Sequence, residues 1–94
     1  MRDVLYSGVI DLAAEIEGKW NLVDFKTSRP LEGECTEDFL QREMETYRPQ
    51  ILGYCEILAK LTGTDPALID AFIYWTAIRR WSVVGGRWSV TGDR

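Results

Sequence analysis

The stretch from Ile69 to Trp75 constrains the fold most, because every residue in it except Asp70 is apolar or aromatic. This pattern predicts a strand buried on both faces of a mixed or parallel sheet. Parallel neighbours need a crossover connection, usually a right-handed one that contains a helix. The chain has 94 residues, which is enough for one domain, so a two-domain enzyme is excluded.

Two further strands are predicted upstream, from Val9 to Ile16 and from Trp20 to Lys26, because apolar and polar side chains alternate in both. The turn candidate between them contains Glu17-Gly18. With a two-residue loop there, residues whose numbers sum to 35 face each other. This register pairs apolar residues with each other and places Asp11 opposite Asp24.

Two helices are expected between the hairpin and the apolar strand. Thr36 is a candidate cap, followed by two acidic residues in the first turn. Arg48-Pro49 predicts a break, since proline costs about 3 kcal/mol inside a helix. The main helix is therefore expected to begin near Thr46 and to end at Gly63. Its predicted apolar stripe consists of Tyr47, Ile51, Tyr54, Leu58 and Leu61.

The last segment predicts a small hairpin, with Ser82–Val84 and Arg87–Val90 joined at Gly85-Gly86. The order of elements is that of an α/β fold.

The composition excludes several kinds of site. The chain has no histidine, and its two cysteines, Cys35 and Cys55, lack a CxxC spacing. This excludes a Cys/His zinc finger, a four-cysteine iron–sulfur cluster, a Ser-His-Asp triad and a Cys-His nucleophile. Both cysteines are expected to be reduced structural thiols. The net charge of −4 excludes binding of nucleic acid by overall charge alone. No leader or long apolar run is present, so no membrane association and a cytoplasmic location are predicted.

Asp11, Asp24 and Lys26 are the candidate chemical group. Opposed carboxylates repel each other unless a positive charge lies nearby, and Lys26 projects from the same face as Asp24. Two carboxylates and an ammonium are the minimum for binding a divalent cation and activating a water. The alternative is a solvated ion-pair cluster on a surface hairpin, and spacing alone leaves both interpretations open.

Three motifs carry a resemblance to a known family. They are Gly8-Val9-Ile10-Asp11, then Leu22-Val23-Asp24-Phe25-Lys26-Thr27, then Tyr47-Arg48-Pro49-Gln50 continuing to Tyr54. In order and spacing they resemble the RecB-type (RecB/AddA-like) branch of the PD-(D/E)XK nuclease superfamily, over about residues 8–75. The resemblance implies a restriction-endonuclease-like mixed sheet with a crossover helix.

The resemblance also implies roles for individual residues. Asp11 and Asp24 are the implied Mg²⁺ ligands, with the backbone carbonyl of Phe25, and Mn²⁺ is the expected substitute. Lys26 is the implied catalytic lysine, and Gln50 and Tyr54 reach the site from the helix. For Tyr54 the alternative is a core residue, and for Gln50 a solvated helix residue.

The chain departs from the family at its beginning. In that family a helix and a strand precede the first motif, and the helix often supplies a histidine ligand, whereas only Met1–Ser7 precede Gly8 here. Residues 1–94 are therefore expected to be a partial nuclease domain that lacks the first helix and strand, with its core motifs in 8–75 and a terminal strand or hairpin in 76–94. We expect weak or no activity and a tendency to self-associate.

The resulting hypothesis is a Mg²⁺-dependent, exonuclease-like deoxyribonuclease of DNA repair or recombination. Its expected partners are DNA and a helicase or another DNA-holding domain. Residues 31–46 are acidic and 76–94 are rich in arginine, so the second stretch is the better candidate to face phosphates. There Trp81 and Trp88 are candidates for stacking on bases, with packing as the alternative. Two other hypotheses remain: a catalytically inactive relic that acts as an interaction or DNA-guiding module, and an unrelated small α+β interaction domain.

Overall fold

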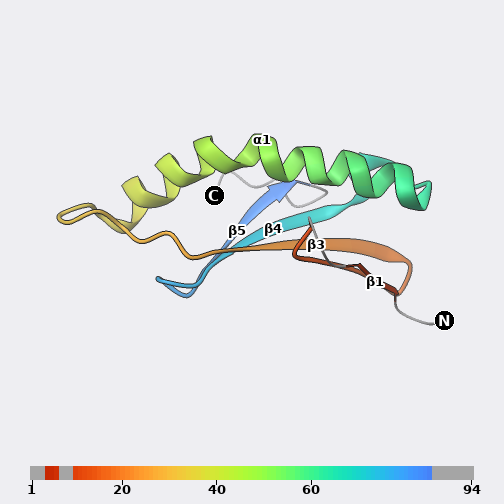
Figure 1. Cartoon of the computed structure of the whole chain (residues 1–94), viewed down its shortest axis with the longest axis horizontal. Coiled ribbons are helices and arrows are strands. Elements are labelled where there is room, and N and C mark those ends of the chain that lie inside the picture. The colour runs from red at the N-terminus through yellow and green to blue at the C-terminus, as the bar shows by residue number, and fades with distance from the viewer. Residues whose placement is uncertain (1–3, 7–9, 86–94) are drawn as a thin grey trace.

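The computed structural model describes residues 4–6 and 10–85, in which one long helix lies across one face of a five-stranded sheet (Figure 1). The strand order is β1-β2-β3-β4-β5. The strands are β1 (Val4–Tyr6), β2 (Leu12–Ile16), β3 (Lys19–Lys26), β4 (Asp70–Trp75) and β5 (Arg80–Gly85). The helices are α1 (Thr36–Thr62) and the 3₁₀ turn η1 (Pro66–Leu68).

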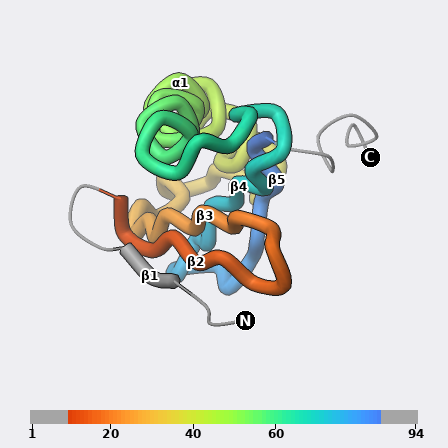
Figure 2. Tube along the Cα trace, turned by 90° about the vertical axis from the view of Figure 1, so that its right-hand side faces the viewer, coloured from red at the N-terminus to blue at the C-terminus, as the bar shows by residue number. Residues whose placement is uncertain are grey.

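The sheet is mixed, because β3 and β4 are parallel while the other neighbouring pairs are antiparallel. α1 connects the two parallel strands and lies on one side of the sheet (Figure 2). This arrangement confirms the predicted α/β class with a crossover helix, and it is compatible with a truncated restriction-endonuclease-like fold.

The first hairpin has the predicted register, with Leu12 opposite Val23. Glu17 and Gly18 have φ angles of 53° and 81°, the positive values that a two-residue turn of this kind requires. β2 begins at Leu12, later than predicted, and residues 7–9 lie outside the described part of the chain. Asp11 therefore precedes the strand and is not paired within it.

A short strand stands before the hairpin. β1 pairs antiparallel with β2, Leu5 lying opposite Ala14. The expectation that the first strand is lacking is therefore wrong. With only three residues, this strand is too short for alternation to be detected in the sequence.

The predicted break in the helix is also wrong, because α1 runs through Pro49 without interruption for 27 residues. Pro49 is exposed, so the missing backbone hydrogen bond faces solvent. Phe39 before it and Ile51 after it are completely buried against the sheet. Burial of two such side chains, at about 1.5–3 kcal/mol each, offsets the cost of about 3 kcal/mol for an internal proline.

The two ends of α1 differ from prediction in one respect. Gly63 ends the helix in the left-handed region at φ 72°, as predicted. Thr36 is the first helical residue and not the cap, since Cys35 holds the cap position without a side-chain hydrogen bond.

The buried stripe of α1 also differs from the prediction at one residue. Leu61, predicted on the buried stripe, is 64% exposed. The buried stripe instead passes through Cys55 and the residues beside it, because that side of the helix packs against the sheet. None of the described helices, α1 included, has the length and apolarity of a membrane span.

The core lies between α1 and the sheet. On β4, Ala71, Ile73 and Trp75 face the helix and are fully buried. Phe72 and Tyr74, on the other face, are only half-buried, so the prediction of burial on both faces holds for one face alone. The reason is that α1 covers a single face (Figure 2).

The edge of the sheet beyond β4 is formed by β5, which contains the predicted Ser82–Val84 segment and pairs with β4. Ser82 accepts a hydrogen bond from the indole nitrogen of Trp75 at 2.8 Å. The second predicted arm, Arg87–Val90, lies outside the described residues.

On α1, burial raises the pKa of the Cys55 thiol to about 11, in keeping with an unreactive structural thiol.

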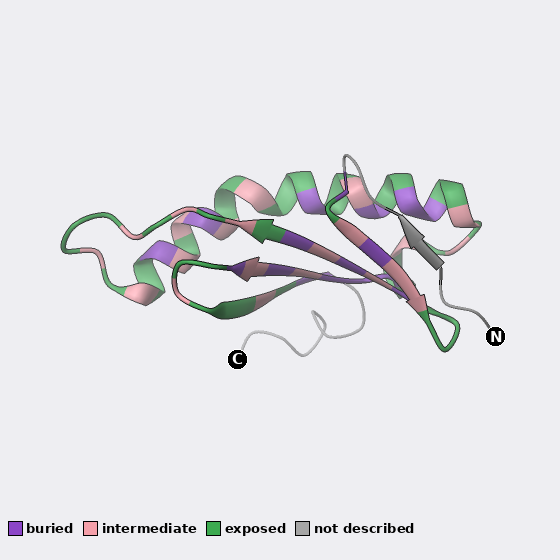
Figure 3. Ribbon diagram, turned by 60° about the horizontal axis from the view of Figure 1, so that its bottom comes forward, coloured by how far each residue is buried: buried purple, intermediate pink, exposed green. Residues whose placement is uncertain are grey.

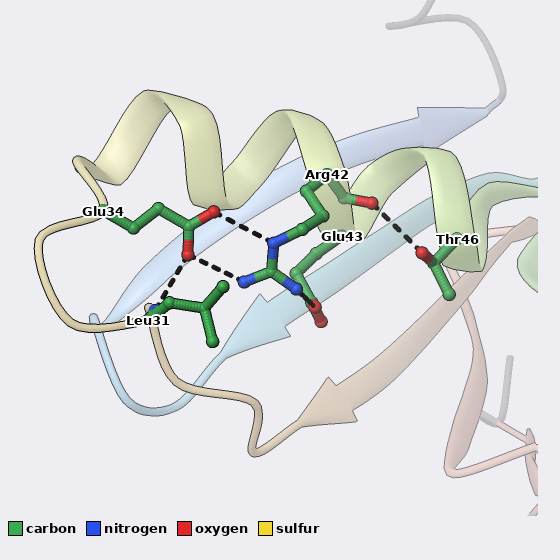
Figure 4. A network of polar contacts seen from close by, with 5 residues as sticks. All are labelled: Leu31, Glu34, Arg42, Glu43 and Thr46. Carbon is green, nitrogen blue, oxygen red and sulfur yellow. Dashed lines mark hydrogen bonds and ion pairs between the residues drawn. The ribbon is translucent and has the colours of Figure 1, made fainter.

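The loop between β3 and α1 is tied to the helix by an ion cluster (Figure 4). Arg42 donates two hydrogen bonds to the Glu34 carboxylate, at 2.8 and 2.9 Å, and a third to Glu43 at 2.7 Å. Glu34 also accepts a bond from the backbone amide of Leu31 at 2.8 Å. We call Glu34, Arg42 and Glu43 the loop clasp.

Candidate functional site

Asp24 lies on the helix-facing side of β3, in the row of buried side chains that includes Leu22. It is only 4% exposed. Burial raises the pKa of Asp24, the ammonium of Lys26 opposes that shift, and the nearby Asp11 carboxyl reinforces it. A carboxylate at this position is therefore poorly stabilised when charged, unless another cation approaches it.

Lys26, two residues further along β3, is held from two elements. Its ammonium lies 2.9 Å from Asp24 Oδ2 and donates a 2.9 Å hydrogen bond to the Gln50 side-chain carbonyl. It also lies 4.1 Å from the centroid of the Tyr47 ring, as a cation–π contact. The strand is anchored at this point because Thr76 donates a backbone and a hydroxyl hydrogen bond to the Lys26 carbonyl. The ammonium is thus fixed between β3 and α1.

Lys26 and Asp24 form an ion pair, in which the ammonium nitrogen lies 2.9 Å from Oδ2 of the carboxylate. The ammonium offsets only part of the cost of burying this carboxylate, since burial still raises the pKa of Asp24. A buried carboxylate whose charge is only partly compensated is costly to the folded state. A further cation bound at the Asp24 carboxylate would compensate the remaining charge.

Asp11 approaches the cluster differently from the strand pairing predicted for it. Its side chain is exposed, and Oδ2 accepts a 2.9 Å hydrogen bond from the backbone amide of Phe25. Because β2 begins only at Leu12, no backbone carbonyl of that strand accepts a hydrogen bond from this amide. The Asp11 carboxylate accepts it instead. Asp11 reaches the neighbourhood of Asp24 through this bond, so the expected proximity is present although the expected strand pair is not.

The residues that α1 contributes to the candidate site differ in whether they contact Lys26. Gln50 contacts Lys26, as the motif resemblance implies. Tyr54 is half-buried against the core and makes no polar contact within residues 10–85. Tyr47, which the sequence analysis placed in the apolar stripe and at the start of the third motif, is the ring beneath Lys26. Its position three residues before Gln50, on the same helix face, was the available signal.

The donor set at this place fits a hard divalent cation in part. Mg²⁺ takes oxygen ligands and binds through one or two carboxylates completed by water and substrate oxygens. Asp11 and Asp24 supply two carboxylates. Across the described ranges, no three His, Cys, Asp or Glu side chains form a group that holds a metal. A metal would thus need non-protein oxygens or a backbone carbonyl, such as that of Phe25, as further ligands.

Comparison with known proteins gives one informative match. No protein-family model matches the chain, and no solved structure matches it either. Over 78 residues it is 32% identical to an ATP-dependent helicase/nuclease subunit of Limosilactobacillus fermentum (strain NBRC 3956 / LMG 18251). The match covers 83% of this chain and 6% of that protein. The chain is therefore similar in sequence to a short segment of a helicase/nuclease subunit.

Proposed function

We propose that this chain is the metal-dependent catalytic portion of a DNA nuclease of the RecB-type PD-(D/E)XK kind, which hydrolyses phosphodiester bonds. The observation that carries the proposal is Asp24, a buried carboxylate with a raised pKa, paired at 2.9 Å with an anchored lysine. The sequence similarity to a helicase/nuclease subunit supports the same class of activity.

Each residue has a separate role in this proposal. Asp11 and Asp24, together with the Phe25 carbonyl, would hold Mg²⁺. The bound ion would polarise the phosphate and lower the pKa of an attacking water. The Lys26 ammonium stabilises negative charge that develops on the phosphate. Gln50 and Tyr47 position that ammonium through the contacts described above. Tyr54 belongs to the proposed site, although its side chain makes no polar contact within residues 10–85.

The setting we propose is DNA repair or recombination, with exonuclease-like cleavage. The chain is acidic overall, so it does not grip DNA by net charge. A helicase or another DNA-holding domain would deliver the strand, and the cytoplasm would be the compartment.

Calorimetric titration with Mn²⁺ tests the metal site. Saturable binding is expected for the wild-type chain and is expected to be lost in Asp24→Asn, which removes the buried carboxylate charge. Glu34→Gln is the matched control because it removes one acidic charge from the loop clasp, and it should bind Mn²⁺ as the wild type does. Equal binding by all three proteins would refute a site at Asp24.

Cleavage assays test the chemistry. With Mg²⁺ or Mn²⁺ present, Lys26→Met is expected to lower the rate on single- and double-stranded DNA by about 10²–10³-fold, since it removes the charge that faces the phosphate. Glu34→Gln is again the control. Residual cleavage that is the same in Lys26→Met and in the wild type would point to a contaminating nuclease and would contradict the proposal.

A second candidate is a catalytically inactive relic of the same fold that acts as an interaction or DNA-guiding module. It is favoured by the ligand set, which within residues 10–85 stops at two carboxylates. The two candidates separate in the Mn²⁺ titration, because a relic shows no saturable binding in either the wild type or Asp24→Asn.

A further inference from the structure

Within the described residues, the Lys26 ammonium contacts one charged side chain and two neutral ones. It lies 2.9 Å from Asp24 Oδ2, donates a 2.9 Å hydrogen bond to Gln50 Oε1 and lies 4.1 Å from the centroid of the Tyr47 ring. An ammonium has three N–H donors, so these three partners match its full capacity. The Lys26 side chain is only 17% exposed. With these contacts in place, the ammonium has no spare N–H for a phosphate.

The charged partner is the group that the proposed metal also requires. Asp24 is 4% exposed and occupies one of the buried positions that alternate with less buried ones along β3 (Figure 3). A carboxylate at such a position needs a cation beside it. Lys26 supplies that cation at Oδ2 and compensates the charge in part. A divalent ion would therefore compete with the ammonium for the same carboxylate, because two cations that share it repel each other.

The two neutral partners both come from α1, and they can hold the ammonium without the carboxylate. Tyr47 and Gln50 are three residues apart, which places them on the same face of the helix. The side-chain carbonyl of Gln50 accepts a hydrogen bond, and the face of the Tyr47 ring attracts a cation. Neither partner cancels the positive charge. An ammonium held by these two alone keeps its full charge and has one N–H free for a phosphate oxygen.

We propose that Lys26 competes with the metal for the Asp24 carboxylate, and that Gln50 and Tyr47 retain the ammonium when it leaves Asp24. This inference rests on the proposed function, because it concerns the same metal site. It adds an order of events, in which Lys26 leaves Asp24 when the metal binds and only then reaches the phosphate. Gln50 is thus a positioning residue that influences metal binding through Lys26.

Calorimetric titration of Lys26→Met with Mn²⁺ tests the competition. Loss of the competing ammonium should tighten Mn²⁺ binding at least about tenfold relative to the wild type. Lys19→Met is the matched control, since it removes one positive charge from an exposed position of the same strand, and its affinity should stay within about twofold of the wild type. Lys26→Gln retains a hydrogen-bond donor without the charge. It should give the same gain in affinity, and it replaces Lys26→Met if that variant does not fold.

A double-mutant cycle with Gln50 separates displacement of the ammonium from simple charge repulsion. The ammonium tolerates the loss of Gln50 better while Asp24 still holds it than after it has left Asp24. Gln50→Leu should therefore weaken Mn²⁺ binding about threefold or more. In the Lys26→Met background the same substitution should leave the Mn²⁺ affinity unchanged, because no ammonium remains to be held. Gln41→Leu, at another exposed position of α1, is the matched control and should bind Mn²⁺ as the wild type does.

The outcomes distinguish this inference from the proposed function. Equal Mn²⁺ affinity of the wild type and Lys26→Met would overturn the competition and leave the metal site standing. If Gln50→Leu has no effect in the wild type, or weakens binding equally in both backgrounds, Gln50 does not act through Lys26. Absence of binding in the wild type, Lys26→Met and Lys26→Gln alike would refute both proposals. Binding by Lys26→Met alone would support the competition but contradict metal binding by the wild type.

Discussion

The protein contains two clusters of the same formal composition, each with two carboxylates and one cation. The loop clasp has Glu34 and Glu43 around Arg42, whereas the candidate site has Asp11 and Asp24 around Lys26. In the loop clasp a planar guanidinium donates three hydrogen bonds, two of them to one carboxylate (Figure 4). In the candidate site a single ammonium makes one contact with Asp24, at 2.9 Å from Oδ2.

The two clusters shift carboxyl pKa values in opposite directions. Hydrogen bonds from Arg42, then from the Leu31 amide, lower the pKa of Glu34 to about 2. Burial raises the pKa of Asp24 in spite of Lys26. One oxygen of Glu43 is buried without a hydrogen bond, so the loop clasp is not fully satisfied. The contrast indicates that the loop clasp holds a loop, whereas the charge of the Asp24 carboxylate is only partly compensated by its neighbours.

The largest effect is expected from Trp75→Ala, which breaks the packing that both clusters share. Trp75 lies opposite Lys26 in the sheet and meets Phe39 edge-on at 5.6 Å, and the Phe39 ring in turn faces the Arg42 guanidinium. Because Trp75 is completely buried, its truncation should destabilise the fold by about 3–5 kcal/mol. Urea denaturation measures this. Trp81→Ala, on the exposed face, is the control and should cost about 1 kcal/mol or less.

The next effect is expected from Lys26→Met, which sharpens the comparison by removing the only cation that contacts Asp24 in the described structure. The buried carboxylate then loses its partner, so we expect a loss of about 1–3 kcal/mol at neutral pH and a further rise in the pKa of Asp24. Denaturation and carboxyl NMR titration measure the two quantities. Lys19→Met, at an exposed position on the same strand, is the control. Unchanged stability of Lys26→Met would show that Asp24 does not depend on Lys26.

A smaller effect, of opposite sign, is expected from Asp24→Asn without metal. Because its folded-state pKa lies above the usual 3.8, the folded protein binds a proton more readily than the unfolded chain. Stability from this group is therefore present at low pH and falls as pH rises from about 3.8 through the raised pKa. The asparagine removes this decline, so at neutral pH we expect stability equal to the wild type or higher by up to about 1 kcal/mol. A variant clearly less stable than the wild type at neutral pH would contradict the comparison.

The smallest effect is expected at the loop clasp. The pKa of Glu34, about 2, lies below its usual 4.5, so its contribution to stability is present above pH 4.5 and is lost as pH falls toward 2. Amide exchange at Leu31, which donates to Glu34, should therefore accelerate at acid pH while the core remains protected. Glu34→Gln should remove this pH dependence. If Leu31 exchange shows no step between pH 4.5 and 2, the loop is held by other contacts.

Much of the fold followed from local patterns. The register of β2 and β3 was predictable because a two-residue turn with Gly18 fixes which residues face each other. The end of α1 at Gly63 was predictable because glycine adopts the left-handed conformation without strain. In the candidate site, Gln50 lies where the resemblance of the three motifs to a known family implied, against Lys26.

The failures share a cause, which is that local signals omit what packs against a segment. Pro49 reads as a helix break because its intrinsic cost is local, whereas the burial of Phe39 and Ile51 that offsets it depends on the sheet. The loop clasp joins residues on a loop and a helix, and no pattern in the sequence marks that pairing.

The sequence by itself determined the strand pairing of the hairpin, the apolar character of β4 and which residues carry the candidate chemistry. Only the tertiary structure decided that Asp24 is buried under α1, that Tyr47 lies beneath Lys26 and that Phe25 and Trp81 stay exposed. The physical reason is that pKa values, cation–π contacts and exposure depend on which elements cover a side chain, and α1 covers only one face of this sheet.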